Sequence, residues 1–137
     1  MSFRSLFPKH HDGSREVSTL LVRNQTRMAT IADSAQVADT SATRRKGLLG
    51  RKTFNAGEGL WISPCESIHT FWMKFPIDVI YLDRKKRVRK IRTSIVPWRL
   101  SMCLLADSVL EVPAGTINRT DTRPGDQLEL IYTNQHP

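Results

Sequence analysis

Short runs of apolar or alternating residues, separated by turn-forming residues, recur along the whole chain. Residues 17–24 are rich in β-formers and residues 28–34 alternate, so each predicts a strand. The continuous apolar run at 79–82 predicts a strand buried on both faces. Residues 83–86 then predict a hairpin turn into a basic edge strand at 88–95. Further strands are expected at 60–63, 68–73, 109–112 and 128–132.

Two short helices are expected between these strands. Residues 39–43 offer several side-chain oxygens that can cap a helix over 41–49, which Gly47 weakens and Gly50 ends. A second turn or helix is expected over 116–120, and 101–107 fits a short strand or a helical turn equally well. The pattern predicts an α+β protein, predominantly β, folded as a small distorted barrel or sandwich.

Length and composition are those of one globular domain. The 137 residues are 39% apolar and 25% charged, and we expect a loosely ordered leader over 1–15 and a domain over 16–134. No apolar run is long enough to span a bilayer, and residues 1–14 lack the apolar stretch of a secretory signal. We therefore expect a cytoplasmic protein. Cys65 and Cys103 are too few for a disulfide framework, and we expect free thiols.

The positive charge is concentrated in one part of the chain. The net charge is +8, and residues 44–99 hold 14 basic and four acidic residues. Residues 84–92 alone carry seven basic side chains, and 44–52 form a second basic segment. Such a surface attracts phosphates or nucleic acids, although a solvated basic face explains it equally simply. No known nucleic-acid-binding motif accompanies these segments.

Most of the reactive groups lie in the window 65–83. Cys65 and His69, with Asp78 or Glu111 as an orienting acid, supply the residue types of a thiol enzyme. On an extended backbone, however, residues four apart lie about 13 Å from each other. Shared chemistry between Cys65 and His69 therefore requires a bend, for which Pro64 is one candidate.

Metal binding is a weaker hypothesis for the same window. Cys65, His69 and Cys103 could supply three ligands, but no paired motif such as CxxC or HxxxH supports a site. A buried thiol beside a hydrogen-bonded histidine explains the same residues. We expect neither a metal nor a cofactor.

The aromatic and charged residues of this window also predict a binding site. Phe71, Trp72, Phe75 and Tyr81 could line a pocket, but a β core has the same aromatic content, and at least two of the four are expected to belong to it. A buried Asp78 must be paired or hydrogen-bonded, because an isolated buried charge is unstable. Its expected partners are the cations Lys74, Arg44 and Arg51, and Glu111 is expected to pair in the same way.

Several motifs follow one another in the order typical of a known family. They are Arg44-Arg-Lys-Gly-Leu-Leu-Gly-Arg51, Gly57-Glu-Gly-Leu-Trp-Ile62, Phe71-Trp-Met-Lys74, Pro76-Ile-Asp-Val-Ile-Tyr-Leu-Asp83, Leu110-Glu-Val-Pro-Ala-Gly115 and Pro124-Gly-Asp126. Together they resemble the DUF192 (UPF0127) family over residues 17–133. The chain departs from the family pattern after Lys74, where an Asn-Thr pair is missing, and at Lys86, where a glycine is common. The resemblance implies a compact β-rich fold and no activity.

The leading interpretation is a non-enzymatic binding or accessory module whose pocket is edged by residues 65–78. Its partner is expected to be a small ligand or another protein. Two rivals stay open. One is a nucleic-acid or phosphate binder acting through 44–52 and 84–92, and the other is a thiol enzyme or metal protein centred on Cys65 and His69.

Overall fold

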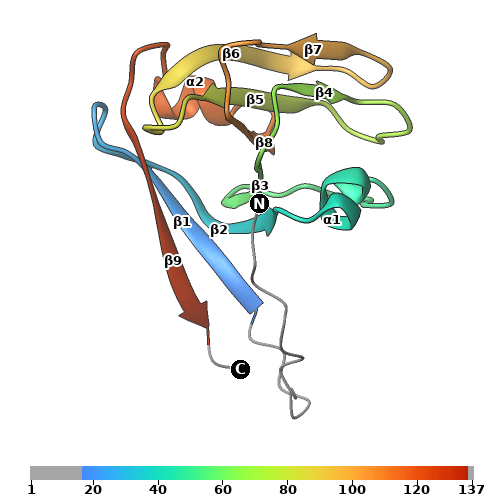
Figure 1. Cartoon of the computed structure of the whole chain (residues 1–137), viewed down its shortest axis with the longest axis horizontal. Helices are drawn as coiled ribbons and strands as arrows, with labels where there is room; N and C mark the ends of the chain where they lie inside the picture. Colours follow the sequence, from blue (N-terminus) through green and yellow to red (C-terminus); the bar gives the residue numbers. More distant parts are fainter. Residues whose placement is uncertain (1–16, 136–137) are drawn as a thin grey trace.

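Nine strands and two short helices make up residues 17–135, the part of the chain that the computed structural model describes (Figure 1). The expected leader, residues 1–15, lies outside it. The strands are β1 (Val17–Asn24), β2 (Ala29–Ala38), β3 (Glu58–Ile62), β4 (Ser67–His69), β5 (Ile77–Leu82), β6 (Val88–Ile95), β7 (Leu100–Met102), β8 (Ser108–Pro113) and β9 (Leu128–Gln135). The helices are α1 (Ser41–Lys46) and α2 (Thr116–Thr120).

Seven of the strands form one strongly curved sheet in the order β6-β5-β8-β3-β2-β1-β9. Only the β2–β3 pair among them is parallel. The two edge strands approach each other at a single bridge, Arg87 to Gln127, so the sheet is not a closed barrel. β4 and β7 form a separate two-stranded sheet beside β5 and β6 (Figure 1). The predicted class, mostly β and distorted sandwich-like, is confirmed.

The large sheet has an apolar core on each of its two faces. Every residue of β5 is buried, as its continuous apolar run predicts. Ile80 and Leu82 pack into one core with residues of β1, β2, β8 and α2. Ile77, Val79 and Tyr81 alternate onto the other face and pack with Leu48, β4 and the segments around Phe54 and Phe75. The Tyr81 hydroxyl and Ser101 Oγ lie 2.7 Å apart, which ties the small sheet to the large one.

Several predicted boundaries shift where the backbone turns. α1 ends at Lys46 instead of residue 49, because Gly47 leaves helical geometry at φ 47°. β4 ends at His69, and Trp72 adopts a positive φ of 66° that no strand permits. Within the ambiguous 101–107 segment the chain forms the end of β7 followed by a turn. Lys86 has a φ of 63°, a backbone conformation that glycine adopts more readily than lysine.

The two helices are short and differ in how they begin. Thr40 caps α1, since its side chain accepts a hydrogen bond from the Thr43 backbone N–H and the Thr43 hydroxyl accepts one from the Thr40 N–H. α2 instead begins after Gly115, and Ile117 on this helix is buried in the first core. Among the described residues no helix has the length and apolar character needed to cross a bilayer.

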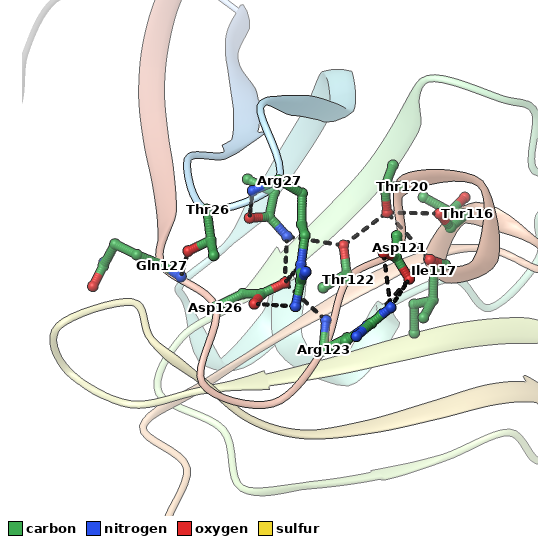
Figure 2. Close-up of polar contacts among 11 residues, drawn as sticks. Thr26, Arg27, Thr116, Ile117, Thr120, Asp121, Thr122, Arg123, Asp126 and Gln127 are labelled. Carbon is green, nitrogen blue, oxygen red and sulfur yellow. Dashed lines mark hydrogen bonds and ion pairs between the residues drawn. The ribbon is translucent and has the colours of Figure 1, made fainter.

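The buried carboxylate of Asp126 links two turns at one end of the sheet. Figure 2 shows the Asp126 carboxylate facing the Arg27 guanidinium, whose Nε and Nη2 donate to its two oxygens at 3.0 and 3.2 Å. Asn24 Nδ2 and the Arg123 backbone N–H donate to it as well, at 3.0 and 2.9 Å. Burial by itself would raise the pKa of Asp126, but these hydrogen bonds outweigh it and lower the pKa below its ordinary value of 3.8. The cluster therefore fastens the β1–β2 turn to the turn before β9.

We expect Asp126→Asn to lower the free energy of unfolding by about 1.5–3 kcal/mol, because it removes charge-assisted hydrogen bonds from a buried position. Asp121→Asn is the matched control, since Asp121 is exposed and its pair with Arg123 contributes little. The stabilisation by Asp126 is fully present above about pH 4 and is lost as the pH falls through its depressed pKa. Urea unfolding from pH 7 to pH 3 measures both effects. Equal losses in the two variants would contradict the assignment.

Candidate functional site

An open pocket of about 530 Å³ lies between α1 and the segment that leads into β4. α1 and the turn after it supply one wall, residues 64–69 supply the opposite wall, and β3 and β8 supply the floor. The lining residues are Ser41, Arg44, Arg45, Lys46, Gly47, Leu48, Leu49, Ile62, Pro64, Cys65, Glu66, Ser67, Ile68, His69, Met73 and Glu111. The pocket therefore brings together Arg44, Cys65, His69 and Glu111 from the residues that the sequence singled out.

Cys65 and His69 both line this pocket, and the backbone bends at Glu66 between them before it continues as β4. The Cys65 thiol donates to the Ser67 carbonyl oxygen at 3.1 Å. Burial raises the pKa of this thiol, and the hydrogen bond to Ser67 offsets that rise only in part. His69 is exposed, and its Nδ1 accepts a hydrogen bond from the Phe71 backbone N–H at 3.3 Å. The thiol therefore remains protonated at neutral pH, the opposite of an activated nucleophile.

Glu111 is the unusual group of the pocket. It lies on β8 opposite Leu60 and Val79, is only 4% exposed, and faces the pocket. Among residues 17–135, no hydrogen bond or ion pair to its carboxyl group is formed, so the predicted pairing with a cation is wrong within this range. Burial raises its pKa to about 8. At neutral pH the side chain is mostly a neutral carboxylic acid, which can donate one hydrogen bond and accept others.

Asp78 lies on the other face of the sheet and is no part of the pocket. One of its oxygens accepts from the Ser94 backbone N–H at 2.8 Å, and the other accepts from Gly115 N–H at 3.1 Å and Ile117 N–H at 2.9 Å. The prediction of an ion pair with Lys74, Arg44 or Arg51 is therefore wrong. Three backbone donors satisfy the buried charge without any cation, and its role is structural.

Arg44 is the half-buried cation of the pocket wall. Its Nη1 donates to the Pro64 carbonyl oxygen at 3.2 Å, which links α1 to the segment opposite. Arg45 and Lys46 are exposed at the same rim. These three bases outnumber Glu66, the exposed acid that also lines the pocket, so the entrance carries a net positive charge.

The other predicted binding residues lie outside this pocket. Arg51 pairs with Glu58 at 3.5 Å and donates to Gln36 Oε1 at 2.9 Å. Phe71, Trp72 and Lys74 belong to the loop after β4, where Trp72 and Lys74 are exposed and Phe71 is half-buried. Of the ambiguous aromatics, Phe75 and Tyr81 pack in the second core.

The structure also places the residues proposed for metal binding. Cys65 and Cys103 are free thiols that pack against the same core, and the Cys103 backbone N–H donates to the Glu66 carbonyl oxygen at 2.8 Å. Within residues 17–135 no group of three His, Cys, Asp or Glu side chains is arranged to hold a metal ion. Cys103 does not line the pocket that Cys65 and His69 share.

Sequence reasoning missed the apolar part of the pocket. Ile62, Ile68 and Met73 form its apolar surface, although each comes from an ordinary strand or loop pattern. Arg45 and Lys46 were visible as part of a basic helix, but nothing in the sequence alone indicated what that helix faces. The basic segment 84–92 occupies the β5–β6 turn and the edge strand β6, as predicted, and is separate from this pocket.

We expect the titration of Glu111 to make the protein less stable as the pH rises. An unfolded glutamate releases its proton near 4.5, whereas folded Glu111 retains it until about pH 8. The free energy of unfolding therefore falls between these values, by roughly 5 kcal/mol at most, and levels off above them. Urea unfolding of the wild type and Glu111→Gln from pH 5 to pH 9 tests this. The difference between the two proteins should change over this range, and a constant difference would refute it.

We expect Asp78→Asn to lower the free energy of unfolding by about 2–4 kcal/mol, because the amide nitrogen would face a buried backbone N–H that loses its acceptor. Asp39→Asn removes the same charge from an exposed position and should change stability by less than about 0.5 kcal/mol. Chemical denaturation measures both. A tolerated Asp78→Asn would show that these hydrogen bonds do not hold α2 in place.

Comparison with known proteins agrees with this architecture. The model of the DUF192 family, described as "Uncharacterized ACR, COG1430", matches residues 22–130. The UPF0127 protein TK1120 of Thermococcus kodakarensis is 31% identical over 121 residues, covering 84% of this chain and 76% of that protein. A UPF0127 protein of Pyrococcus abyssi is 31% identical over 118 residues, covering 81% and 97%.

A solved structure shows the same fold. It is a protein of unknown function from Novosphingobium aromaticivorans, which superposes with a TM-score of 0.70 at 24% identity and covers 81% of this chain and 83% of its own. None of these names states an activity. The family match over most of the chain and the curated relatives identify the chain as a member of the DUF192 (UPF0127) family, whose function is unknown.

Proposed function

We propose that the pocket between α1 and residues 64–69 binds a small organic anion that carries both a carboxylate and an apolar portion. The observation that carries the proposal is Glu111, a buried acid that reaches the pocket without a hydrogen bond to any residue from 17 to 135. Its carboxyl group lines an open pocket, so a ligand that enters the pocket can form the hydrogen bond that no residue in this range makes.

The charges around the pocket favour an anion over a cation. Arg44, Arg45 and Lys46 at the rim attract negative charge and repel positive charge. Neutral Glu111 can donate a hydrogen bond from its carboxylic acid O–H to a ligand carboxylate. Arg44 can contribute a second, charge-assisted hydrogen bond from the wall.

The apolar lining supports an amphipathic molecule. Ile62, Ile68 and Met73 offer surface on which a short aliphatic or aromatic body can be removed from water. Binding, without covalent chemistry, is the function we favour here. The Cys65 thiol has a raised pKa and donates its proton to a backbone carbonyl, so it lacks the activation that a nucleophile needs.

Thermal unfolding and calorimetry with a panel of monocarboxylates, from acetate to octanoate and including benzoate, test the proposal. We expect at least one of the longer or aromatic acids to raise the unfolding temperature, since a ligand at 100 times its Kd stabilises by about 2.7 kcal/mol. Its affinity should fall about tenfold between pH 7 and pH 9, as Glu111 ionises with a pKa of about 8.

Three variants separate the pocket from general charge effects. Glu111→Gln should abolish the fall in affinity between pH 7 and pH 9, because an amide does not ionise. Arg44→Gln should weaken binding about tenfold or more, whereas Arg89→Gln removes the same charge from exposed β6 and should leave binding unchanged. Binding that Arg89→Gln and Arg44→Gln weaken equally would refute a site in the pocket, as would no binding of any acid in the panel.

A further inference from the structure

Exposed apolar side chains are concentrated on one surface of the molecule. Trp72 is 71% exposed, Leu100 71%, Leu104 72% and Leu105 68%, and Trp98 and Met102 are each more than half exposed. We call these six residues the apolar ridge. In residues 17–135 the other strongly exposed large apolar side chains are Val96, which adjoins the ridge in sequence, and two from distant elements, Met28 and Tyr132.

Five of the ridge residues lie along the chain from Trp98 to Leu105, and contacts between loops bring Trp72 beside them. Trp72 and Trp98 come from different loops, but their rings meet edge to face with centroids 4.6 Å apart. Thr70 joins these loops, because its hydroxyl and backbone bond to the backbone of Val96, Trp98 and Arg99. β7 continues the ridge, since Leu100 and Met102 point outward while Ser101 between them is buried.

The fold does not require these side chains to be apolar. Each lies largely in water, so a polar residue in its place would leave the two cores intact. Trp72 and Trp98 in addition hold left-handed backbone conformations, with φ of 66° and 70°, which are uncommon for aromatic residues. Contiguous exposed apolar surface of this kind is a feature of interaction sites.

Basic side chains flank the ridge on the same surface. Lys90 Nζ donates to the Met102 carbonyl oxygen at 2.7 Å, which places β6 against β7. Arg84, Lys85 and Arg87 line a shallow hollow with Leu105. The acids in this region are Asp83 and Asp107, which line the same hollow, and Glu66, which lies opposite Cys103. Asp107 is 3.7 Å from Arg84, and the four bases Arg84, Lys85, Arg87 and Lys90 outnumber these three acids by one.

We propose that the apolar ridge docks on the surface of a bilayer that contains anionic lipids. Tryptophan side chains prefer the boundary between headgroups and acyl chains, and leucine and methionine beside them gain from leaving water. Lysine and arginine near an anionic leaflet add about 1 kcal/mol each. The ridge and its flank supply both, and the chain would lie on the membrane without crossing it.

The charge pattern is the reason to choose a bilayer over other partners. A single-stranded nucleic acid would use stacking surfaces between the cations, whereas here four of the six ridge residues are aliphatic or thioether side chains. A second copy of the chain would bring two cationic flanks together. An anionic leaflet instead complements an apolar ridge with a cationic border.

Co-sedimentation of the full chain with vesicles tests this. We expect binding to vesicles of phosphatidylcholine and phosphatidylglycerol, weakening as salt is added, and at least tenfold weaker binding to phosphatidylcholine alone. Leu104→Ser with Leu105→Ser should weaken binding at least about tenfold, because two leucine side chains that would enter the bilayer are lost. Met28→Ser with Tyr132→Ser also removes two exposed apolar side chains, but away from the ridge, and should bind as the wild type does.

Several results would overturn the proposal. These are no sedimentation with phosphatidylglycerol vesicles at low salt, undiminished binding by the Leu104/Leu105 variant, or equal losses in the two double variants. If no vesicle binding is seen, two other results would assign the surface to another partner. Dimerisation that the Leu104/Leu105 variant abolishes would assign it to a second copy of the chain. Binding of a single-stranded RNA through the ridge would assign it to a nucleic acid. The urea unfolding midpoints of both double variants are the control: midpoints equal to that of the wild type would show that any loss of vesicle binding does not come from misfolding. Glu111→Gln should bind vesicles normally, so this test is independent of the pocket.

Discussion

The hydrogen bonds that the backbone makes to Asp78 are the constraint on which much of the structure depends. This fully buried carboxylate accepts from Ser94 on β6 and from Gly115 and Ile117 at the start of α2. The β5–β6 ladder shifts register beside Asp78, and Ser94 takes a positive φ of 49°, so its N–H is free to point at the acid. One side chain thereby joins three elements and fixes where β8 leaves the sheet. A buried charge is tolerable here because the backbone supplies every partner that it needs.

The same sheet presents a second buried acid in the opposite situation. Glu111 sits on β8 beside Val79, and alternation along paired strands sends it to the face opposite Asp78. There it meets a pocket instead of backbone donors, and burial keeps it mostly protonated at neutral pH. Two acids in similar sequence contexts thus have different surroundings: backbone donors surround one, and the other lines the pocket. The basic rim formed by α1 then determines the sign of the charge that this pocket favours.

The pocket and the apolar ridge share one support, the small β4–β7 sheet. His69 at the pocket stacks on Phe71, and Phe71 stacks on Trp98 of the ridge, with ring centroids 5.0 and 5.7 Å apart. β4 pairs with β7 from His69 opposite Leu100 to Ser67 opposite Met102, so these four side chains share one face of the small sheet, with the pocket residues on β4 and the ridge residues on β7. A molecule bound in the pocket and a surface met by the ridge would therefore lie at neighbouring places on the protein.

Apolar pattern and turn chemistry by themselves determined most of the strands, the buried run of β5, the basic edge strand β6 and the position of α2, because these depend on local preferences and burial. The sequence also indicated Arg44, Cys65, His69 and Glu111 as candidates. Only the tertiary structure decided which acid accompanies them. Strand register sets the face on which a side chain lies. Asp78 accepts hydrogen bonds from Gly115 and Ile117, which lie 37 and 39 residues further along the chain. Partners so distant in sequence leave no local signal, and for the same reason the sequence could not show that α1 faces residues 64–69.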